Sequence, residues 1–188
     1  MKTNLLPALR LTLVCIVFFM GIYTVLMLGA AKLIAPNHGD GETVTENGKV
    51  IGYALIGQSF THDNYFNGRP SAVNYNAAGS GGSNKGPSNP DYLADVQKRI
   101  DTFLVHNSSV KKEEIPSELV TASGSGQDPD VSPKGVFVQV ARIAKARNIS
   151  EEKITALVNS NIQKPLFGLF GTSHINILKL NIALDNLK

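Results

Sequence analysis

A run of twenty-one residues without a single charge, 11–31, constrains the fold of this chain more than any other feature. At about 1.5 Å of rise per residue, a helix of this length spans roughly 30 Å, the thickness of the hydrocarbon core of a bilayer. A cleaved signal peptide is the alternative, because the small residues at 28–30 resemble a cleavage site. Signal sequences usually have a shorter apolar region, of about 7–15 residues. We therefore predict a retained transmembrane helix at 11–31.

The charges before this run predict its orientation. Residues 1–10 contain Lys2, Arg10 and the α-amino group, and short basic tails tend to stay on the cytoplasmic side. We expect 1–10 to be cytoplasmic. A connector at 32–48 and a single domain at 49–188 would then lie outside, in the periplasm or on the outer face of a bacterial inner membrane.

The composition excludes several classes of function. The formal net charge is only +3, and no basic stripe with interleaved aromatic residues is present, so nucleic-acid binding is not expected. Cys15 is the single cysteine, which rules out an intrachain disulfide and a multi-cysteine metal site. The four histidines are far apart in sequence, and no histidine or carboxylate cluster has metal-ligand spacing, so no metal site is expected.

The soluble part predicts an α+β fold, a mixed α/β domain with few strands. Helix starts are indicated where a capping residue precedes a helix, twice with proline at the first helical position. They are expected at Asn89-Pro90, with a helix to about Val105, at Ser132-Pro133, with a helix to about Arg147, and at Ser150. Apolar, β-branched runs predict a mostly buried strand at 50–60 and a short strand within 115–123. A final strand is predicted at 174–184, and its last residues are also compatible with a helix.

The recognised catalytic motifs are absent. Lys85 lies among glycines, but it is followed by glycine where a phosphate-binding loop needs serine or threonine. No Gly-x-Ser-x-Gly nucleophile motif occurs. The residues alone thus favour an assembly or interaction subunit with no catalytic residues. Two alternatives stay open, an anchored hydrolase that uses Ser80, Ser123 or Ser125 with His62, and an anchored protein that binds a small ligand.

Several stretches, in order along the chain, together resemble the C subunit of the Kdp potassium-transporting P-type ATPases. They are "ALIGQSF" (54–60) with "YFNGRPSA" (65–72), "SGGSNKGPSNP" (80–90), "LVTASGSGQDPDVSP" (119–133) with "VARIAKARNIS" (140–150), and "INILKLNIALD" (175–185). The resemblance runs from the anchor to the last residues. At Lys85, Gln127 and Asp130 the chain departs from the residues common in that family.

The resemblance implies a role in a bacterial inner-membrane complex for potassium uptake. The expected partners are a channel-like potassium-binding subunit, a P-type ATPase subunit and a small single-span subunit. The C subunit has one transmembrane helix and an extracytoplasmic domain. It has been described as a catalytic chaperone that raises the affinity of the ATPase subunit for ATP. An external domain cannot touch a cytoplasmic nucleotide site, so such an effect would have to pass through the membrane helices.

Two sets of candidate site residues follow. The sequence "SGGS" is similar to the signature loop of ABC transporters, which contacts ATP, and ATP binding is expected only in the assembled complex. The nucleotide candidates are Ser80, Gly81, Gly82, Ser83 and Lys85. The alternative is an ordered structural loop in which Gly79, Gly81 and Gly82 adopt backbone conformations closed to other residues. Aromatic residues and arginine favour the centres of interfaces, so the candidates for subunit contact are Tyr65, Phe66, Arg69 and Tyr75.

Overall fold

A computed structural model describes residues 2–187, with side chains from residue 4 onwards. The chain divides into two compact units, one ending at Thr43 and one beginning at Val44. Each unit is considered by itself.

The first unit is a long apolar helix. It consists of α1 (Lys2–Cys15), a π-helical stretch η1 (Ile16–Tyr23) and α2 (Thr24–Ile34), followed by the 3₁₀ turn η2 (Pro36–Gly39). Asn4–Ile34 is the one candidate membrane span within the described residues, and none of its most apolar window is buried against protein. The helix begins earlier than the predicted span 11–31 and continues through Pro7. The length and exposure fit a helix that faces lipid.

The second unit opens with a small hairpin, β1 (Thr43–Glu46) and β2 (Lys49–Tyr53). Asn47 and Gly48 form its turn and both have positive φ, which is the backbone geometry that two-residue hairpin turns favour. The mostly buried strand predicted at 50–60 is wrong in extent and in environment. β2 ends at Tyr53 and is largely exposed, because its one partner is β1, which the sequence analysis placed in the connector.

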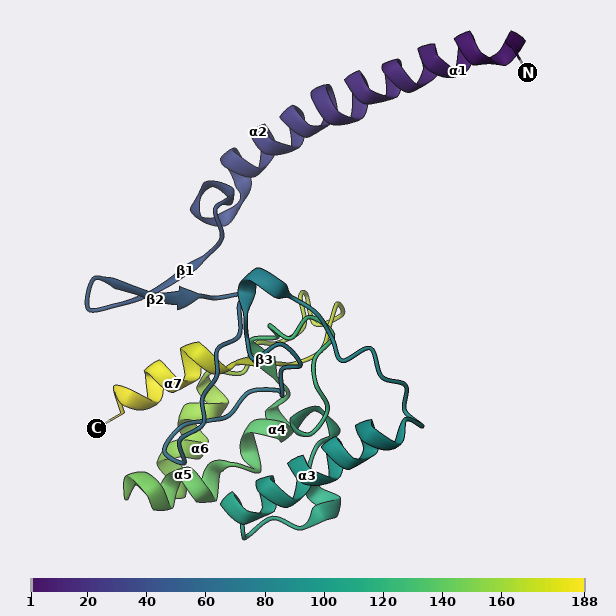
Figure 1. The fold of residues 1–188 in the computed structure, drawn as a ribbon. Coiled ribbons are helices and arrows are strands. Elements are labelled where there is room, and N and C mark those ends of the chain that lie inside the picture. The colour runs from purple at the N-terminus through teal and green to yellow at the C-terminus, as the bar shows by residue number, and fades with distance from the viewer. Residues whose placement is uncertain (1, 188) are drawn as a thin grey trace. The chain divides into compact units, whose positions relative to one another are not determined.

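Five helices and a second sheet, of two strands with two residues each, complete the described part of the unit (Figure 1). The helices are α3 (Pro90–His106), α4 (Pro133–Phe137), α5 (Val140–Arg147), α6 (Glu151–Ser160) and α7 (Ile177–Asp185), with short 3₁₀ turns η3 (Ala77–Gly79), η4 (Lys112–Glu114) and η5 (Ser117–Leu119). The strands β3 (Asp130–Val131) and β4 (Ile175–Asn176) are antiparallel. This arrangement confirms the α+β prediction.

The predicted helix starts are confirmed by their caps. The side chains of Asn89, Ser132 and Ser150 accept hydrogen bonds from the backbone N–H groups of the third residue that follows each of them. The predicted helix from Ser132 to Arg147 is, however, two helices, since α4 ends at Phe137 and α5 begins at Val140.

Of the other two strand predictions, one is wrong and one is confirmed only at its start. Residues 115–123 contain the 3₁₀ turn η5 and no strand, because no neighbouring strand is available to pair with them. In the stretch 174–184 only Ile175 and Asn176 are extended, and α7 follows. The Asn176 side chain caps α7 by accepting from the Lys179 N–H at 3.0 Å. The buried residues of α7 recur with helical spacing, at Ile177, Leu178, Leu180, Asn181 and Leu184.

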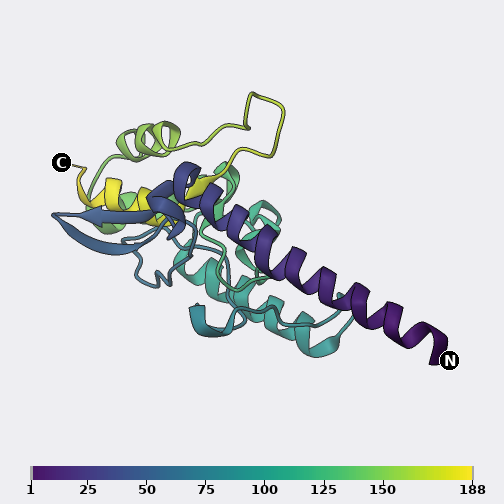
Figure 2. The same ribbon diagram turned by 90° about the horizontal axis from the view of Figure 1, so that it is seen from above.

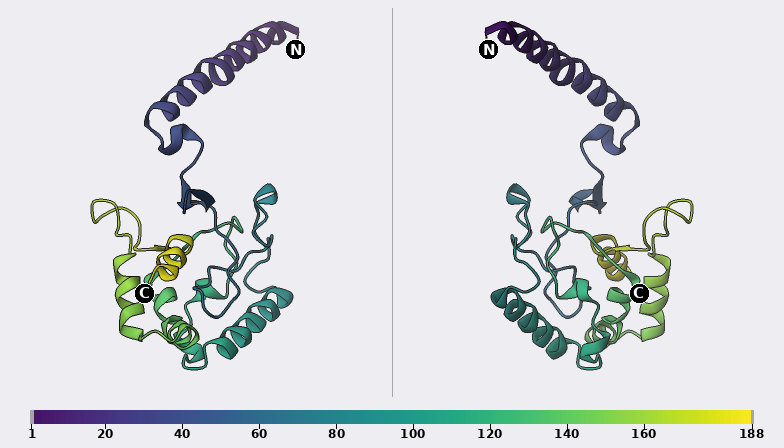
Figure 3. Two further views of the ribbon diagram at one scale, coloured as in Figure 1. Left: turned by 90° about the vertical axis from the view of Figure 1, so that its left-hand side faces the viewer. Right: turned by 90° about the vertical axis from the view of Figure 1, so that its right-hand side faces the viewer.

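The core lies between α4, α5, α6 and α7, and four residues from outside these helices join it, Phe66, Leu119, Val131 and Ile175. Phe66 is completely buried against this cluster. The helices leave one end of the unit to loops. Figures 1 and 3 show the β1–β2 hairpin and the loop between α6 and α7 at the same end, and α3 toward the opposite end. Figure 2, seen from above, shows how far the α6–α7 loop stands out from the helices.

Candidate functional site

Side-chain amides hold an irregular segment, residues 54–69, against the helices. Asn181 of α7 accepts from the Phe66 N–H at 2.9 Å and donates to the Phe66 carbonyl at 3.0 Å. Gln139 makes the same pair of bonds with the backbone of Asn67, at 2.8 and 3.2 Å. Each buried side-chain amide thus bonds one backbone N–H and one backbone carbonyl, as a neighbouring β-strand would. This pairing matters because backbone groups are costly to bury without a partner.

Arg142 on α5 completes this attachment. Its side chain is 4% exposed, and all five of its N–H groups donate hydrogen bonds, the full capacity of a guanidinium. The acceptors are the backbone carbonyls of Asp63 and Tyr65 and the side-chain oxygens of Asn67, Asn107 and Gln139, at 2.6–3.1 Å. Burial lowers the pKa of Arg142, and the nearby Asp63 carboxylate, 3.9 Å away, partly offsets this.

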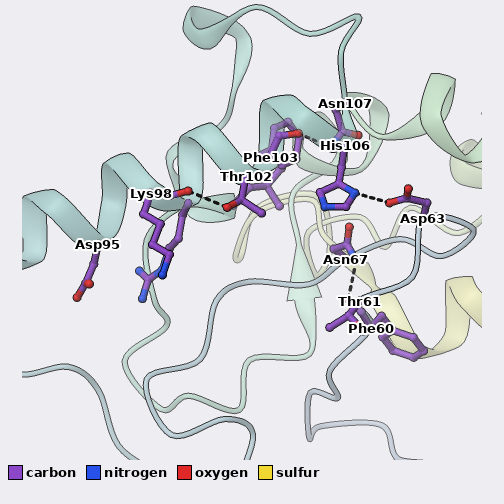
Figure 4. A pocket seen from close by; sticks show the side chains of 12 residues that line it. Phe60, Thr61, Asp63, Asn67, Asp95, Lys98, Thr102, Phe103, His106 and Asn107 are labelled. Carbon is purple, nitrogen blue, oxygen red and sulfur yellow. Dashed lines mark hydrogen bonds and ion pairs between the residues drawn. The ribbon is translucent and has the colours of Figure 1, made fainter.

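A groove of about 620 Å³ lies between α3 and the segment that Arg142 holds (Figure 4). Its apolar lining comes from Phe60, Phe103 and Leu119, and Lys98 and Arg99 add positive charge from α3. The side chains of Asp63 and His106 point toward one another in Figure 4, with Oδ1 and Nδ1 2.8 Å apart. Its volume lies within the range of small-molecule sites in proteins.

The structure does not assemble the hydrolase alternative. Asp63 pairs with His106 and not with its sequence neighbour His62. Ser123 is buried, and the Ser80 hydroxyl donates to the Ser125 carbonyl at 2.9 Å. Among the side chains of residues 4–187, no hydrogen bond joins His62 to a serine, and no group of three metal-ligating side chains occurs.

The predicted nucleotide candidates lie in a loop that packs on a second glycine-containing loop. The Ser80 hydroxyl and the Gly81 N–H both donate to the Ser125 carbonyl at 2.9 Å. Lys85 donates to Asp95 on α3 at 3.1 Å. Gly82 approaches Gly124 so closely that an added Cβ would lie 3.1 Å from its carbonyl oxygen. Three donors that a phosphate would need are therefore engaged within the domain.

The expectation about backbone conformation in this loop is wrong. Gly79, Gly81 and Gly82 do not have positive φ; the left-handed residues of the segment are Asn74, Tyr75 and Asn84. Asparagine tolerates this conformation because its side chain can bond local backbone groups. At Gly82 glycine is needed for the close approach to Gly124, and not for its φ angle.

The four candidates for subunit contact mainly tie the segment to its own domain. Phe66 lies in the core and is not exposed. The Arg69 guanidinium contacts the Asp128 carboxylate at 2.9 Å, and the Tyr75 hydroxyl donates to the Arg69 carbonyl. Burial raises the pKa of Tyr75. Arg69 and Tyr75 are only partly buried, and their contact with a partner stays a prediction.

Tyr65 is attached from two sides. Its hydroxyl donates to Asp185 at 2.9 Å, which raises the pKa of Tyr65. The Arg147 guanidinium lies over its ring, 4.8 Å from the centroid, and pairs with Asp185 at 2.7 Å. Aromatic face, cation and carboxylate thus form one cluster at the C-terminal end of α7. Tyr65 is partly buried, and its contact with a partner stays a prediction.

Comparison of the sequence with known proteins shows the family of the chain. The family model described as "K+-transporting ATPase, c chain" matches residues 5–186. The chain belongs to the KdpC family. A KdpC subunit from Flavobacterium psychrophilum is 58% identical over 185 residues, covering 98% of this chain and 99% of the relative. One from Bacteroides fragilis is 50% identical over 190 residues (100% and 99%), and one from Caldanaerobacter subterraneus is 44% identical over 176 (94% and 91%). The family resemblance drawn from the sequence is confirmed.

The residues that sequence reasoning missed are the buried polar ones. Arg142 and Asn181 stand on α5 and α7, and Gln139 lies directly before α5; all three are buried among apolar residues. For Asn181 a signal was present, since it occupies the apolar face shared with Ile177 and Leu184. A polar residue at such a position predicts a buried hydrogen-bonding role. No comparable signal identified the acceptors in residues 63–67, because they are largely backbone carbonyls.

Proposed function

We propose that this chain is a non-catalytic accessory subunit of an ATP-driven potassium uptake complex in a bacterial inner membrane. Its partners would be a channel-like potassium-binding subunit, a P-type ATPase subunit and a small single-span subunit. The observation that carries the proposal is the family match over residues 5–186, nearly the whole chain. The relatives named above are potassium-transporting ATPase KdpC subunits and align with the chain from end to end.

In this proposal the helix crosses the membrane once, with 1–10 in the cytoplasm and the folded unit outside. The lipid-facing helix and the basic tail support this orientation. Ser108, exposed after α3, is a suitable reporter. In a Cys15→Ser background, Ser108→Cys should react with a membrane-impermeant thiol reagent in intact spheroplasts. Reaction only after lysis would refute the orientation.

The effect on ATP affinity is proposed to arise in the assembled complex and not from a nucleotide site of the folded unit. Ser80, Gly81 and Lys85 donate to Ser125 and Asp95, and no helix begins directly at these residues, as it does in sites that bind phosphate at a helix N-terminus. The subunit would then change the ATPase subunit through contacts between membrane helices.

Calorimetric titration of Mg-ATP into the purified full-length chain tests this, with Lys85→Ala as the matched variant. No saturable heat is expected from either protein, while adding the chain to the remaining subunits should lower the KM for ATP. Micromolar binding by the chain alone that Lys85→Ala abolishes would instead establish a nucleotide site in the glycine loop. An unchanged KM would remove the proposed effect on affinity altogether.

A further inference from the structure

The loop between α6 and α7 exposes an unusual set of side chains. Leu166, Phe167, Leu169 and Phe170 are 63%, 85%, 80% and 65% exposed, and all four fall within five consecutive residues. Scattered apolar residues on a surface are ordinary, but a contiguous exposed group indicates a surface that something covers. Phe167 also has φ near +54°, a strained conformation for a bulky residue, and one that is retained mainly where function requires it.

Several backbone groups of this loop are hydrogen-bonded to other backbone groups of the same loop. Two antiparallel bridges, Gln163 to His174 and Leu166 to Phe170, close it into a narrow hairpin. Within the tip, backbone N–H groups donate to backbone carbonyls of the same loop at 2.9–3.1 Å, from Leu166, Gly168, Leu169 and Phe170. The hydrocarbon region of a membrane offers no hydrogen-bonding partners, so a segment that enters it must pair its backbone groups internally.

The charge of the loop also favours a lipid surface. From residue 161 to residue 174 the sequence contains no acidic residue; it contains Lys164 and His174 near the base of the hairpin. Apolar and aromatic residues at the tip would lie among the acyl chains of a bilayer, and the Lys164 ammonium behind them would lie among the headgroups, which are often anionic.

The tether keeps this end of the folded unit near the bilayer. Eight residues, 35–42, separate the end of α2 from β1, and at no more than about 3.6 Å per residue they reach less than roughly 30 Å. The β1–β2 hairpin, where the chain enters the folded unit, lies at the same end as the exposed loop (Figures 1 and 3). That end carries further exposed apolar side chains, Val50, Tyr53 and Leu55.

We propose that the tip of this loop, Leu166 to Phe170, inserts into the interfacial region of the same membrane that holds the anchor. The inference rests on the membrane anchorage proposed above and not on the orientation or the partners. The second contact would restrict how the folded unit tilts on its tether, with the apolar tip among the upper acyl chains and Lys164 at the headgroups.

Tryptophan fluorescence tests the proposal directly, because the chain contains no tryptophan. Phe167→Trp reports on the loop and Leu26→Trp on the anchor. Val105→Trp is the matched control, since Val105 is 78% exposed on α3, toward the opposite end of the unit. Each full-length variant is reconstituted in vesicles of phosphatidylcholine and phosphatidylglycerol, with and without bromine on the acyl chains. Leu169→Trp repeats the loop measurement if Phe167→Trp does not fold.

We expect the Phe167→Trp emission to be shifted to shorter wavelength and quenched by brominated lipid, most by bromine near the headgroup end. Interfacial segments place their apolar side chains roughly 5–10 Å into the headgroup and acyl boundary. Val105→Trp should be unquenched. Phe167→Trp indistinguishable from Val105→Trp would refute the insertion, and Leu26→Trp without quenching would instead refute the anchorage. Quenching that disappears when the chain is assembled with the other subunits would assign the loop to a protein partner and overturn the proposal.

Discussion

Replacing Arg142 by methionine removes the centre of the network that attaches residues 54–69 to the helices. Methionine has a similar length and keeps the packing, but it leaves five acceptors without this donor. Two of those acceptors belong to Asn107 and Gln139, which are almost fully buried. Gln139 still accepts from the Asn67 N–H, whereas the Asn107 oxygen and the two backbone carbonyls lose a strong donor.

The size of the effect follows from these contacts. A buried acceptor left without its donor costs about 1–3 kcal/mol, so three such groups, partly rehydrated, imply a loss of about 3–5 kcal/mol, similar to breaking a buried ion pair. For a domain of this size each kcal/mol lowers the melting temperature by roughly 2–4 °C. Multiplying the two ranges gives a fall of about 6–20 °C.

The near-ultraviolet circular dichroism of the tyrosines follows this transition in the detergent-solubilised chain, because Tyr53, Tyr65, Tyr75 and Tyr92 all lie in the folded unit. Lys145→Met is the matched control, since it removes the same charge from an exposed position on the same helix. The control should melt within about 2 °C of the parent, as surface substitutions usually change stability by no more than about 0.5 kcal/mol. An Arg142→Met protein that melts at or above the parent temperature would refute the reasoning, since desolvation of the guanidinium would then outweigh its five hydrogen bonds.

For three further substitutions, the structure predicts whether the stability of the fold rises or falls. Gln127→Leu should raise stability by about 1 kcal/mol, visible as a higher melting temperature, because both polar atoms of this buried amide lack a partner. Asp130→Asn should raise the melting temperature at neutral pH, since burial raises the pKa of this carboxyl above its ordinary 3.8 and the folded state therefore binds its proton more tightly. That gain should fade as the pH falls through the raised pKa of the folded state and should be absent below about 3.8, and a gain independent of pH would contradict it. Gly126→Ala should cost roughly 1–3 kcal/mol, because its φ is positive and an added Cβ would lie 2.9 Å from the Gly81 carbonyl oxygen, whereas Gly86→Ala, with open space around it, should leave denaturant unfolding unchanged.

The features that the sequence predicted correctly are those with local causes. The charge-free run required a long helix whatever its surroundings, and the caps at Asn89, Ser132 and Ser150 act on backbone groups within three residues. The strand predictions were too long at 50–60 and 174–184 and wrong at 115–123, because a strand depends on a partner elsewhere in the chain. Residues 174–184 are apolar in a pattern compatible with either structure, and the cap at Asn176 decides for the helix.

The candidate site could be located only in part. The sequence identifies the two polar loops, but their mutual packing, Gly81 on Ser125 and Gly82 on Gly124, joins residues more than forty positions apart. The left-handed conformations fell on Asn74, Tyr75 and Asn84 and not on the glycines, because the tertiary packing, and not local propensity, sets the path of the loop. The pairing of Asp63 with His106 was likewise invisible until α3 was placed beside the loop.

The amide attachments of residues 54–69 have a consequence for the order in which the chain acquires its structure. Asn176 bonds the carbonyl of Ala54, and Asn181 bonds the backbone of Phe66, across 122 and 115 residues of sequence. The chain loses conformational entropy when it brings such distant residues together, and the hydrogen bonds form only afterwards. Contacts of this kind therefore slow folding. During synthesis the segment emerges well before α7, so the backbone groups of Ala54 and Phe66 lack these two partners until the last helix has been translated. Until then the aromatic ring of Phe66 is without its pocket, and a chain truncated before α7 should be a substrate for proteases even though its anchor is already in the membrane.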